Sequence, residues 1–270
     1  MSLKKKIAEK TGMKNLPSHY QIIGHVFLAK LSRLDKMQKK VFAKAVMEIL
    51  PYIKTVCEIK CIKGTFRKPK TSRILGGSME TVHKENGILY KLDVSKIMFS
   101  KGNMLERQRL VNQIRNGETI IDMFAGIGYF SLGIGKLSKA EKIYSIEKNP
   151  LSFKYLRENI KLNNIKNISP ILGDCRKIKK IKADRILMGY FPGTEKFLKT
   201  AFSFLNNKGI IHYHNIYARN DLMKPIEDVD KAAKKAGYII KSFKQRTVKS
   251  YNAAKDHIVL DVEISKINQI

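Results

Sequence analysis

Residues 119–130 read Thr-Ile-Ile-Asp-Met-Phe-Ala-Gly-Ile-Gly-Tyr-Phe, and this stretch decides the fold. The isoleucines have the character of a buried strand, and Asp122 follows them as a polar end. Gly126 and Gly128 allow the backbone to turn sharply and to approach a ligand closely. A helix is expected directly afterwards. The stretch therefore predicts the first strand–turn–helix unit of an α/β domain that binds a nucleoside-containing ligand.

A second carboxylate supports this interpretation. The strand expected at 141–147 ends at Glu147, about 20 residues beyond the glycine turn, where an acidic side chain holds ribose hydroxyls in nucleoside sites. The spacing Asp-x-Phe-x-Gly-x-Gly, with Phe124 as its aromatic member, is typical of S-adenosylmethionine sites. A dinucleotide fingerprint fits less well, because Ser131 stands where a third Gly or Ala would be needed. Taken singly, the glycines also suit a plain tight turn, and Glu147 a solvated strand end.

After Asp93 strands and helices alternate, which predicts an α/β fold: a seven-stranded, Rossmann-like parallel sheet with helices on both faces. Strands are expected at 119–123, 141–147, 168–172, 184–188, 209–214, 238–246 and 256–264. Helices are expected at 104–115, 129–138, 150–163, 194–205 and 222–236. The last two strands are adjacent in sequence, so we expect an antiparallel edge.

A small α/β domain is predicted at residues 1–82, and the Rossmann-like domain at 83–270. The first has a helix at 4–10, a strand pair within 20–30, and a helix between an Asp35 N-cap and Pro51. Short strands follow at 55–59, 73–75 and 81–83, and Asn86-Gly87 predicts the two-residue turn of a hairpin between 80–85 and 88–92.

The chain is strongly basic. Lys and Arg number 53 against 23 Asp and Glu, a net charge of +30, and 43% of the residues are apolar. Such an excess favours a polyanionic partner, above all nucleic acid; a lysine-rich composition bias or heat adaptation is the alternative. No apolar run has transmembrane length, and the N-terminus lacks the apolar segment of a signal peptide. The three cysteines indicate a reducing cytosol, so a cytoplasmic location is expected.

The ends of the predicted strands supply further candidates for the site. Asp174 and Cys175 follow the third strand, where they would face the adenine. Gly189, Tyr190 and Pro192 follow the fourth strand, where contacts to the substrate base are expected. His212 and His214 on the fifth strand share one face and are candidates for contacts on the substrate side. No third metal ligand follows them at a spacing typical of metal sites, so no metal is expected. The pair Cys57 and Cys61 also lacks partners for a zinc site.

Several motifs together resemble the tRNA-modifying enzymes that act on the purine 3′ to the anticodon. These motifs are His83–Asp93, Phe99-Ser-Lys-Gly-Asn103, Glu106-Arg-Gln-Arg109, 122–128 and Gly173-Asp174. The resemblance covers nearly the whole chain and includes the N-terminal domain. It implies that Ser100, Arg107, Glu147 and Asp174 contact S-adenosylmethionine, with Phe124 lining the pocket. The guanidinium of Arg107 would pair with the cofactor's carboxylate. No general base is implied, so the catalytic residue is left unassigned.

The family has two branches, and the residues after the fourth strand favour one of them. The guanine N1-methyltransferases carry Asn-Leu-Pro there, and Gly-x-Gly-Pro in the first turn. This chain has Gly189-Tyr-Phe-Pro192 and Tyr129 instead. The resemblance therefore implies the wybutosine-pathway branch (enzyme class 2.5.1), which transfers the 3-amino-3-carboxypropyl group to 4-demethylwyosine in tRNA(Phe) and releases methylthioadenosine. A methyltransferase is the first alternative, and a non-catalytic RNA-binding protein the second.

The N-terminal domain is expected to bind and position the tRNA. A run of cations, Lys60, Lys63, Arg67, Lys68 and Lys70, is the predicted contact. Neither a membrane nor a metal is an expected partner, and the sequence gives no protein partner or oligomeric state.

Overall fold

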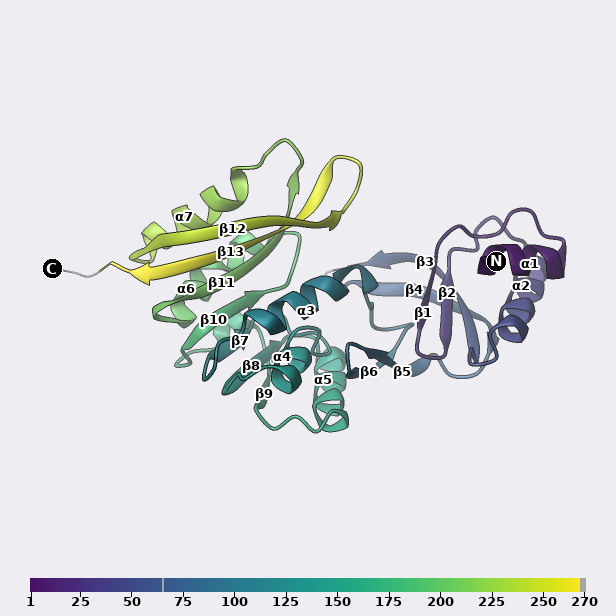
Figure 1. Cartoon of the computed structure of the whole chain (residues 1–270), viewed down its shortest axis with the longest axis horizontal. Coiled ribbons are helices and arrows are strands. Elements are labelled where there is room, and N and C mark those ends of the chain that lie inside the picture. The colour runs from purple at the N-terminus through teal and green to yellow at the C-terminus, as the bar shows by residue number, and fades with distance from the viewer. Residues whose placement is uncertain (65, 268–270) are drawn as a thin grey trace. The chain divides into compact units, whose positions relative to one another are not determined.

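The computed structural model describes residues 1–64 and 66–267, which form two compact units, Met1–Lys101 and Gly102–Ile270 (Figure 1). The expected boundary at 82/83 falls inside a hairpin that the structure includes in the first unit. Two hydrogen bonds join this hairpin to the turn at Gly24 and His25. The amide of Gly24 donates to His83 Nδ1 over 3.2 Å, and that of His25 donates to Thr81 Oγ1 over 3.1 Å. Gly24 has φ +53°, and a Cβ there would lie 2.1 Å from Thr81 Oγ1.

The first unit packs two helices on a four-stranded sheet. The sheet has the order β1 (Tyr20–Ile23), β2 (Val26–Ala29), β3 (Thr55–Lys63), β4 (Lys68–Gly76), with β2 and β3 parallel. α1 (Leu3–Thr11) and α2 (Lys36–Ile49) bury their apolar faces against it. The predicted N-cap of α2 is confirmed: Asp35 Oδ1 accepts from the amide of Gln38 over 2.8 Å, and the Gln38 side chain accepts from the Asp35 amide.

A two-stranded hairpin completes this unit. β5 (Glu80–Glu85) pairs with β6 (Ile88–Asp93) across Asn86 and Gly87, which both have positive φ, so the predicted hairpin is confirmed. The strands predicted at 55–59 and 73–75 were too short. Pairing of β3 with β4 continues to Lys63 and Lys68. The extension carries polar residues on both faces, so it has no apolar alternation from which it could be recognised.

The second unit contains a seven-stranded sheet, as predicted. Its order is β12 (Tyr238–Ser250), β13 (Lys255–Lys266), β11 (Leu205–Ala218), β10 (Ala183–Met188), β7 (Thr119–Asp122), β8 (Lys142–Glu147), β9 (Ile168–Leu172). Neighbours from β11 to β9 are parallel, and β13 is antiparallel to both β11 and β12. The predicted antiparallel edge is therefore confirmed.

Helices cover both faces of this sheet (Figure 1). α3 (Met104–Gln113), α4 (Ser131–Leu137) and α5 (Pro150–Leu162) lie on one face, and α6 (Leu198–Phe204) and α7 (Lys224–Lys235) on the other. Short 3₁₀ turns are η1 (Lys101–Asn103), η2 (Cys175–Lys177) and η3 (Thr194–Phe197). The fifth strand is longer than the predicted 209–214, because its ends pair with β10 at Leu205 and with β13 as far as Ala218. No helix within the described part of the chain is long and apolar enough to cross a membrane.

Candidate active site

The glycine turn between β7 and α4 is shaped for close approach of a ligand. Gly126 has φ +58° and Gly128 has φ +99°, a region that side chains with a Cβ rarely adopt. A Cβ on Gly126 would lie 2.5 Å from the ring of Tyr129, and one on Gly128 would lie 2.5 Å from Leu132. Both positions therefore need glycine for conformation and for space.

Glu147 joins the end of β8 to this turn. Its Oε2 accepts a hydrogen bond from the amide of Gly126 over 2.7 Å, and its Oε1 accepts from the amide of Asn149 over 2.6 Å. Burial raises the pKa of Glu147, while these amides oppose the shift. A carboxylate offers about four acceptor positions, so both oxygens retain capacity for ribose hydroxyls. The structure thus brings together Gly126 and Glu147, which lie 21 residues apart.

Asp122, a predicted cofactor contact, has its side chain buried inside the turn. Its side chain is fully buried; Oδ2 accepts from Ser131 Oγ over 2.6 Å and Oδ1 from the amide of Phe124 over 3.3 Å. Ser145 of β8 donates in turn to Ser131 over 2.8 Å. Burial raises the pKa of Asp122 to about 6. These bonds make Asp122 the internal anchor of the turn, and a direct contact stays a prediction.

Asp174 and Cys175 follow β9 and differ strongly in environment. Asp174 accepts from Arg176 over 2.6 Å and from Lys148 over 3.0 Å, and the hydrogen bond from Arg176 holds its pKa well below the ordinary value. Cys175 is buried, which raises the pKa of its thiol to about 12. The thiol is therefore protonated near neutrality and is no nucleophile.

An aromatic wall connects the glycine turn to the segment after β10. The ring of Phe124 stacks on Tyr190, with centroids 5.1 Å apart, and meets Phe197 edge-on at 4.9 Å. The guanidinium of Arg176 lies over Phe197 at 5.0 Å. Phe197 was not among the predicted residues, because it stands in a helical segment without a motif. The three rings, each partly exposed, form a surface against which a base can stack.

The lack of a side chain at Gly189 does not leave an open space at this position. A Cβ there would lie 2.6 Å from Cε2 of Phe130, so the ring of Phe130 occupies that position. Phe130 in turn contacts the His214 ring, with centroids 5.5 Å apart. Pro192, by contrast, is exposed beside the site segment.

The side-chain amide of Asn215 on β11 holds the segment after β10 in place, and the sequence analysis did not predict this role. Asn215 Oδ1 accepts from the amide of Gly193 over 3.3 Å, and its Nδ2 donates to Glu195 over 2.9 Å. The same Nδ2 donates to the hydroxyl of Tyr213 over 3.0 Å. The sequence signal was a polar residue directly after His214, where the predicted strand ends.

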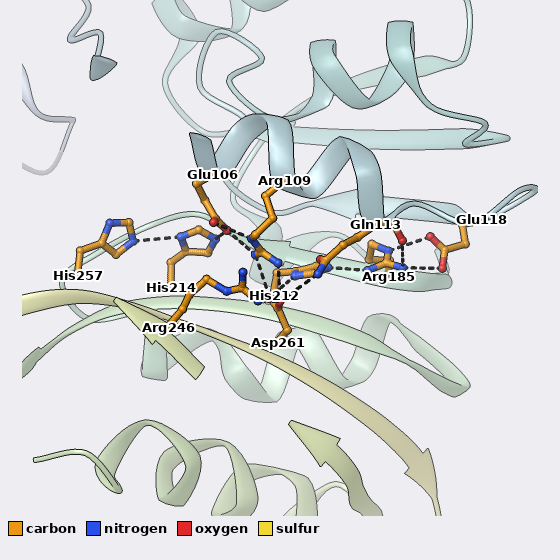
Figure 2. A network of polar contacts seen from close by, with 10 residues as sticks. All are labelled: Glu106, Arg109, Gln113, Glu118, Arg185, His212, His214, Arg246, His257 and Asp261. Carbon is orange, nitrogen blue, oxygen red and sulfur yellow. Dashed lines mark hydrogen bonds and ion pairs between the residues drawn. The ribbon is translucent and has the colours of Figure 1, made fainter. Parts of the chain in front are cut away.

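His212 belongs to a buried polar network between α3 and the sheet (Figure 2). Arg185 Nη1 donates to His212 Nε2 over 2.6 Å, so the ring proton must be on Nδ1, 2.6 Å from Asp261 Oδ1. His212 is 1% exposed, and burial lowers its pKa. The sequence predicts that His212 faces the substrate. The structure instead encloses its ring between Arg185 and Asp261.

The network contains three arginines and three carboxylates, Arg109, Arg185, Arg246, Glu106, Glu118 and Asp261. Arg109 on α3 bonds both Glu106, at 2.5 Å, and Asp261, at 2.6 Å. Arg185 bonds Glu118 over 2.8 Å. The charges balance only when the histidines are neutral. Burial lowers the pKa of His214 well below its usual value, and its Nδ1 lies 3.1 Å from His257 Nε2.

The other two predicted contacts lie before the sheet. Arg107 is on α3 and is 6% exposed. Ser100 lies in the first unit, between β6 and η1. Their contacts with a cofactor stay predictions. No group of three or more His, Cys, Asp and Glu side chains in residues 1–64 and 66–267 is placed to hold a metal ion.

Comparisons with known proteins agree over nearly the whole chain. A model of the TRM5/TYW2 methyltransferase domain matches residues 81–241, and one of the TYW2 N-terminal domain matches residues 1–79. A tRNA(Phe) (4-demethylwyosine(37)-C(7)) aminocarboxypropyltransferase of Methanocaldococcus jannaschii is 42% identical over 92% of this chain and 98% of its own length.

The other branch is also similar. The tRNA (guanine(37)-N(1))-methyltransferase Trm5b of Pyrococcus abyssi is 36% identical over 93% of this chain and 76% of its own length. Among solved structures, M. jannaschii TYW2 in complex with AdoMet superposes with a TM-score of 0.77 at 37% identity, over 92% of this chain and all of that one.

Replacing Glu147 by alanine should weaken S-adenosylmethionine binding roughly tenfold or more, because two charge-assisted hydrogen bonds to the ribose are lost. Glu141→Ala is the matched control, since Glu141 is exposed at the opposite end of β8. Calorimetric titration measures both. Equal affinity in the two variants would remove Glu147 from the site.

Replacing Asp261 by alanine should destabilise the fold by about 3 kcal/mol, because Arg109 and Arg246 lose their buried acceptor. Glu263→Ala, which breaks the exposed pair with Arg115, should cost less than about 1 kcal/mol. Burial opposes the shift, but His212 and Arg109 hold the pKa of Asp261 below its ordinary 3.8.

Because that pKa is depressed, the stabilisation by Asp261 is present above pH 3.8 and is lost as pH falls through the folded value. Urea denaturation across a pH series measures both effects. Similar losses in Asp261→Ala and Glu263→Ala would show that the network contributes little.

Proposed function

Since this chain belongs to the TRM5/TYW2 family, we propose that it transfers the 3-amino-3-carboxypropyl group of S-adenosylmethionine to 4-demethylwyosine at position 37 of tRNA(Phe). The observation that carries the proposal is the match to an aminocarboxypropyltransferase over 92% of this chain and 98% of that relative. The family resemblance of the motifs is thereby confirmed.

The residues at the sheet edge fit this co-substrate. Gly126 and Gly128 leave the turn without Cβ atoms, and Glu147 presents a partly exposed carboxylate to a ribose. We propose that Phe124 lines the nucleoside pocket, and that Arg107 and Ser100 contact the amino-acid part. Bound there, the co-substrate supplies a sulfonium whose carbon substituents are open to displacement.

The transfer exchanges one bond for another. A bond forms between C7 of the base and the terminal carbon of the aminocarboxypropyl chain, while the bond from that carbon to sulfur breaks. Sulfur keeps the electron pair and leaves in methylthioadenosine, and the proton that C7 loses is released to water. Which carbon is attacked depends on the one that the pocket holds in line with the nucleophile. Positioning therefore matters more than acid–base catalysis.

Two alternatives use the same fold. Methyl transfer to guanine would release S-adenosylhomocysteine, and the 36% identity to a guanine methyltransferase keeps it as the second candidate. Gly189 and Tyr129, in place of the Asn and Pro of that branch, favour the aminocarboxypropyl reaction. A non-catalytic RNA-binding role is disfavoured by the intact glycine turn and Glu147.

The net charge and the cysteines of this chain fit a cytosolic tRNA enzyme. The net charge of +30 suits a polyanionic substrate. Cys57, Cys61 and Cys175 are free thiols, as expected in a reducing compartment, and we propose the cytoplasm as its location.

Isotope labelling separates the two reactions. S-Adenosylmethionine labelled in the carboxypropyl chain should leave its label on tRNA that carries 4-demethylwyosine, and methylthioadenosine should accumulate. Co-substrate labelled in the methyl group should leave none. Transfer of the methyl label, with S-adenosylhomocysteine as product, would replace the proposal by the methyltransferase.

Binding of tRNA should weaken steeply with salt, because lysines that neutralise phosphates release counterions. Filter binding across a salt series measures the slope, with a tRNA of unrelated sequence as a comparison for the non-specific part. An affinity that is independent of salt would contradict a contact dominated by phosphates.

A further inference from the structure

The distal end of the β3–β4 hairpin has an unusual arrangement of like charges. Lys63 and Lys68 are directly opposite each other in the register, and Lys70 is opposite Cys61. Lys60, Lys63, Lys68 and Lys70 are all exposed. Like charges at opposed positions repel and destabilise a strand pair. An anion bound between them would remove that cost.

The protein itself supplies no such anion. No Asp or Glu occurs between Ile59 and Leu75. The nearest carboxylate along β3, Glu58, is buried and binds Lys39 of α2 over 2.9 Å. Among the residues that the structure describes, none of these four lysines has an ion-pair partner. The end of the hairpin is thus a cationic surface without internal compensation.

An aromatic ring is exposed at the same end. Phe66, between Gly64 and the start of β4, is 56% exposed, and Ile62 on β3 is 42% exposed. Two other rings of this unit pack on neighbouring rings: Tyr20 stacks on Phe27 at 4.9 Å, and Tyr90 meets Phe99 at 5.2 Å. Within residues 1–64 and 66–101, Phe66 has no aromatic or cation contact.

A flat exposed ring beside uncompensated lysines has the chemistry of a single-stranded nucleic-acid site. Bases stack on aromatic side chains irrespective of sequence, and lysines bind the flanking phosphates. A paired stem would offer phosphates to the lysines but no free base face to the ring. The exposed ring therefore distinguishes an unpaired nucleotide from a helical backbone.

We propose that Phe66 is a stacking platform for an unpaired nucleotide of the tRNA, with Lys63 and Lys68 binding the phosphates beside it. This inference rests on the proposed function, because it takes tRNA as the partner. It adds a second recognition site, on a hairpin of the first unit, to the pocket at the edge of the seven-stranded sheet.

The test compares three variants of the full chain in filter binding to tRNA(Phe) across a salt series. Phe66→Ala should raise Kd about tenfold at every salt concentration, because stacking does not depend on counterion release. The double variant Lys63→Ala/Lys68→Ala should instead reduce the slope of log K against log salt by roughly one to two. Phe66→Tyr keeps a ring and should restore wild-type Kd.

Tyr52→Ala is the matched control. Tyr52 is equally exposed, at 55%, in the same unit, but it lies in the turn after α2 and not between opposed lysines. This variant should keep wild-type Kd and salt slope. A Phe66→Ala variant that binds like wild type, or a loss of the same size in Tyr52→Ala, overturns the stacking site.

Product analysis separates this inference from the proposed function. If wild-type protein binds tRNA with the predicted ring dependence but forms no methylthioadenosine, the stacking site stands and the reaction falls. If methylthioadenosine forms and Phe66→Ala has wild-type Kd, the reaction stands and the stacking site falls. If wild-type protein fails to bind tRNA, both are wrong.

Discussion

The carboxylate of Asp261 is the interaction on which the architecture of the second unit depends. It accepts from Arg109 of α3, from His212 of β11 and from Arg246 of β12, so one side chain on β13 fixes three neighbouring elements. His212 and Asp261 are also directly opposite in the register of β11 and β13. A slip of one residue would turn Asp261 to the other face and leave buried arginines without an acceptor. The network thus selects a single register for the antiparallel edge.

Similar residue types carry different functions at the sheet edge because their burial differs. Asp122 and Glu147 both end strands, but only Glu147 keeps a partly exposed carboxylate, while Asp122 is enclosed by Ser131 and the Phe124 amide. Burial likewise keeps Cys175 protonated and His214 neutral. These groups are poor partners for proton exchange near neutral pH. The pocket therefore supplies shape and fixed dipoles, which is what a displacement at a sulfonium carbon requires.

Local signals explain how much of the fold could be predicted from the sequence. Asp35 and the Asn86-Gly87 pair act on their immediate neighbours, and the glycine turn is read from four residues. The lengths of β3 and β4 could not be predicted, because their extensions carry polar residues on both faces. The length of β11 depends on pairing with β10 and β13, which are distant in sequence from parts of this strand. The network was equally hidden: Arg109 and Asp261 are 152 residues apart. The contact between Gly126 and Glu147 could be predicted, because alternating strands and helices place the ends of β7 and β8 side by side.

Selection between the methyl and the aminocarboxypropyl carbon of the sulfonium must come from the walls of the pocket. The contact between Phe130 and Gly189 shows how such walls are coupled: a side chain at 189 requires the ring to move, since its Cβ would lie 2.6 Å from Cε2. Phe130 also packs on His214, which belongs to the buried network. A substitution at 189 would therefore displace a ring that is supported from behind by β11. Because several walls would have to shift together, restoring the missing Asn alone is not expected to convert one reaction into the other.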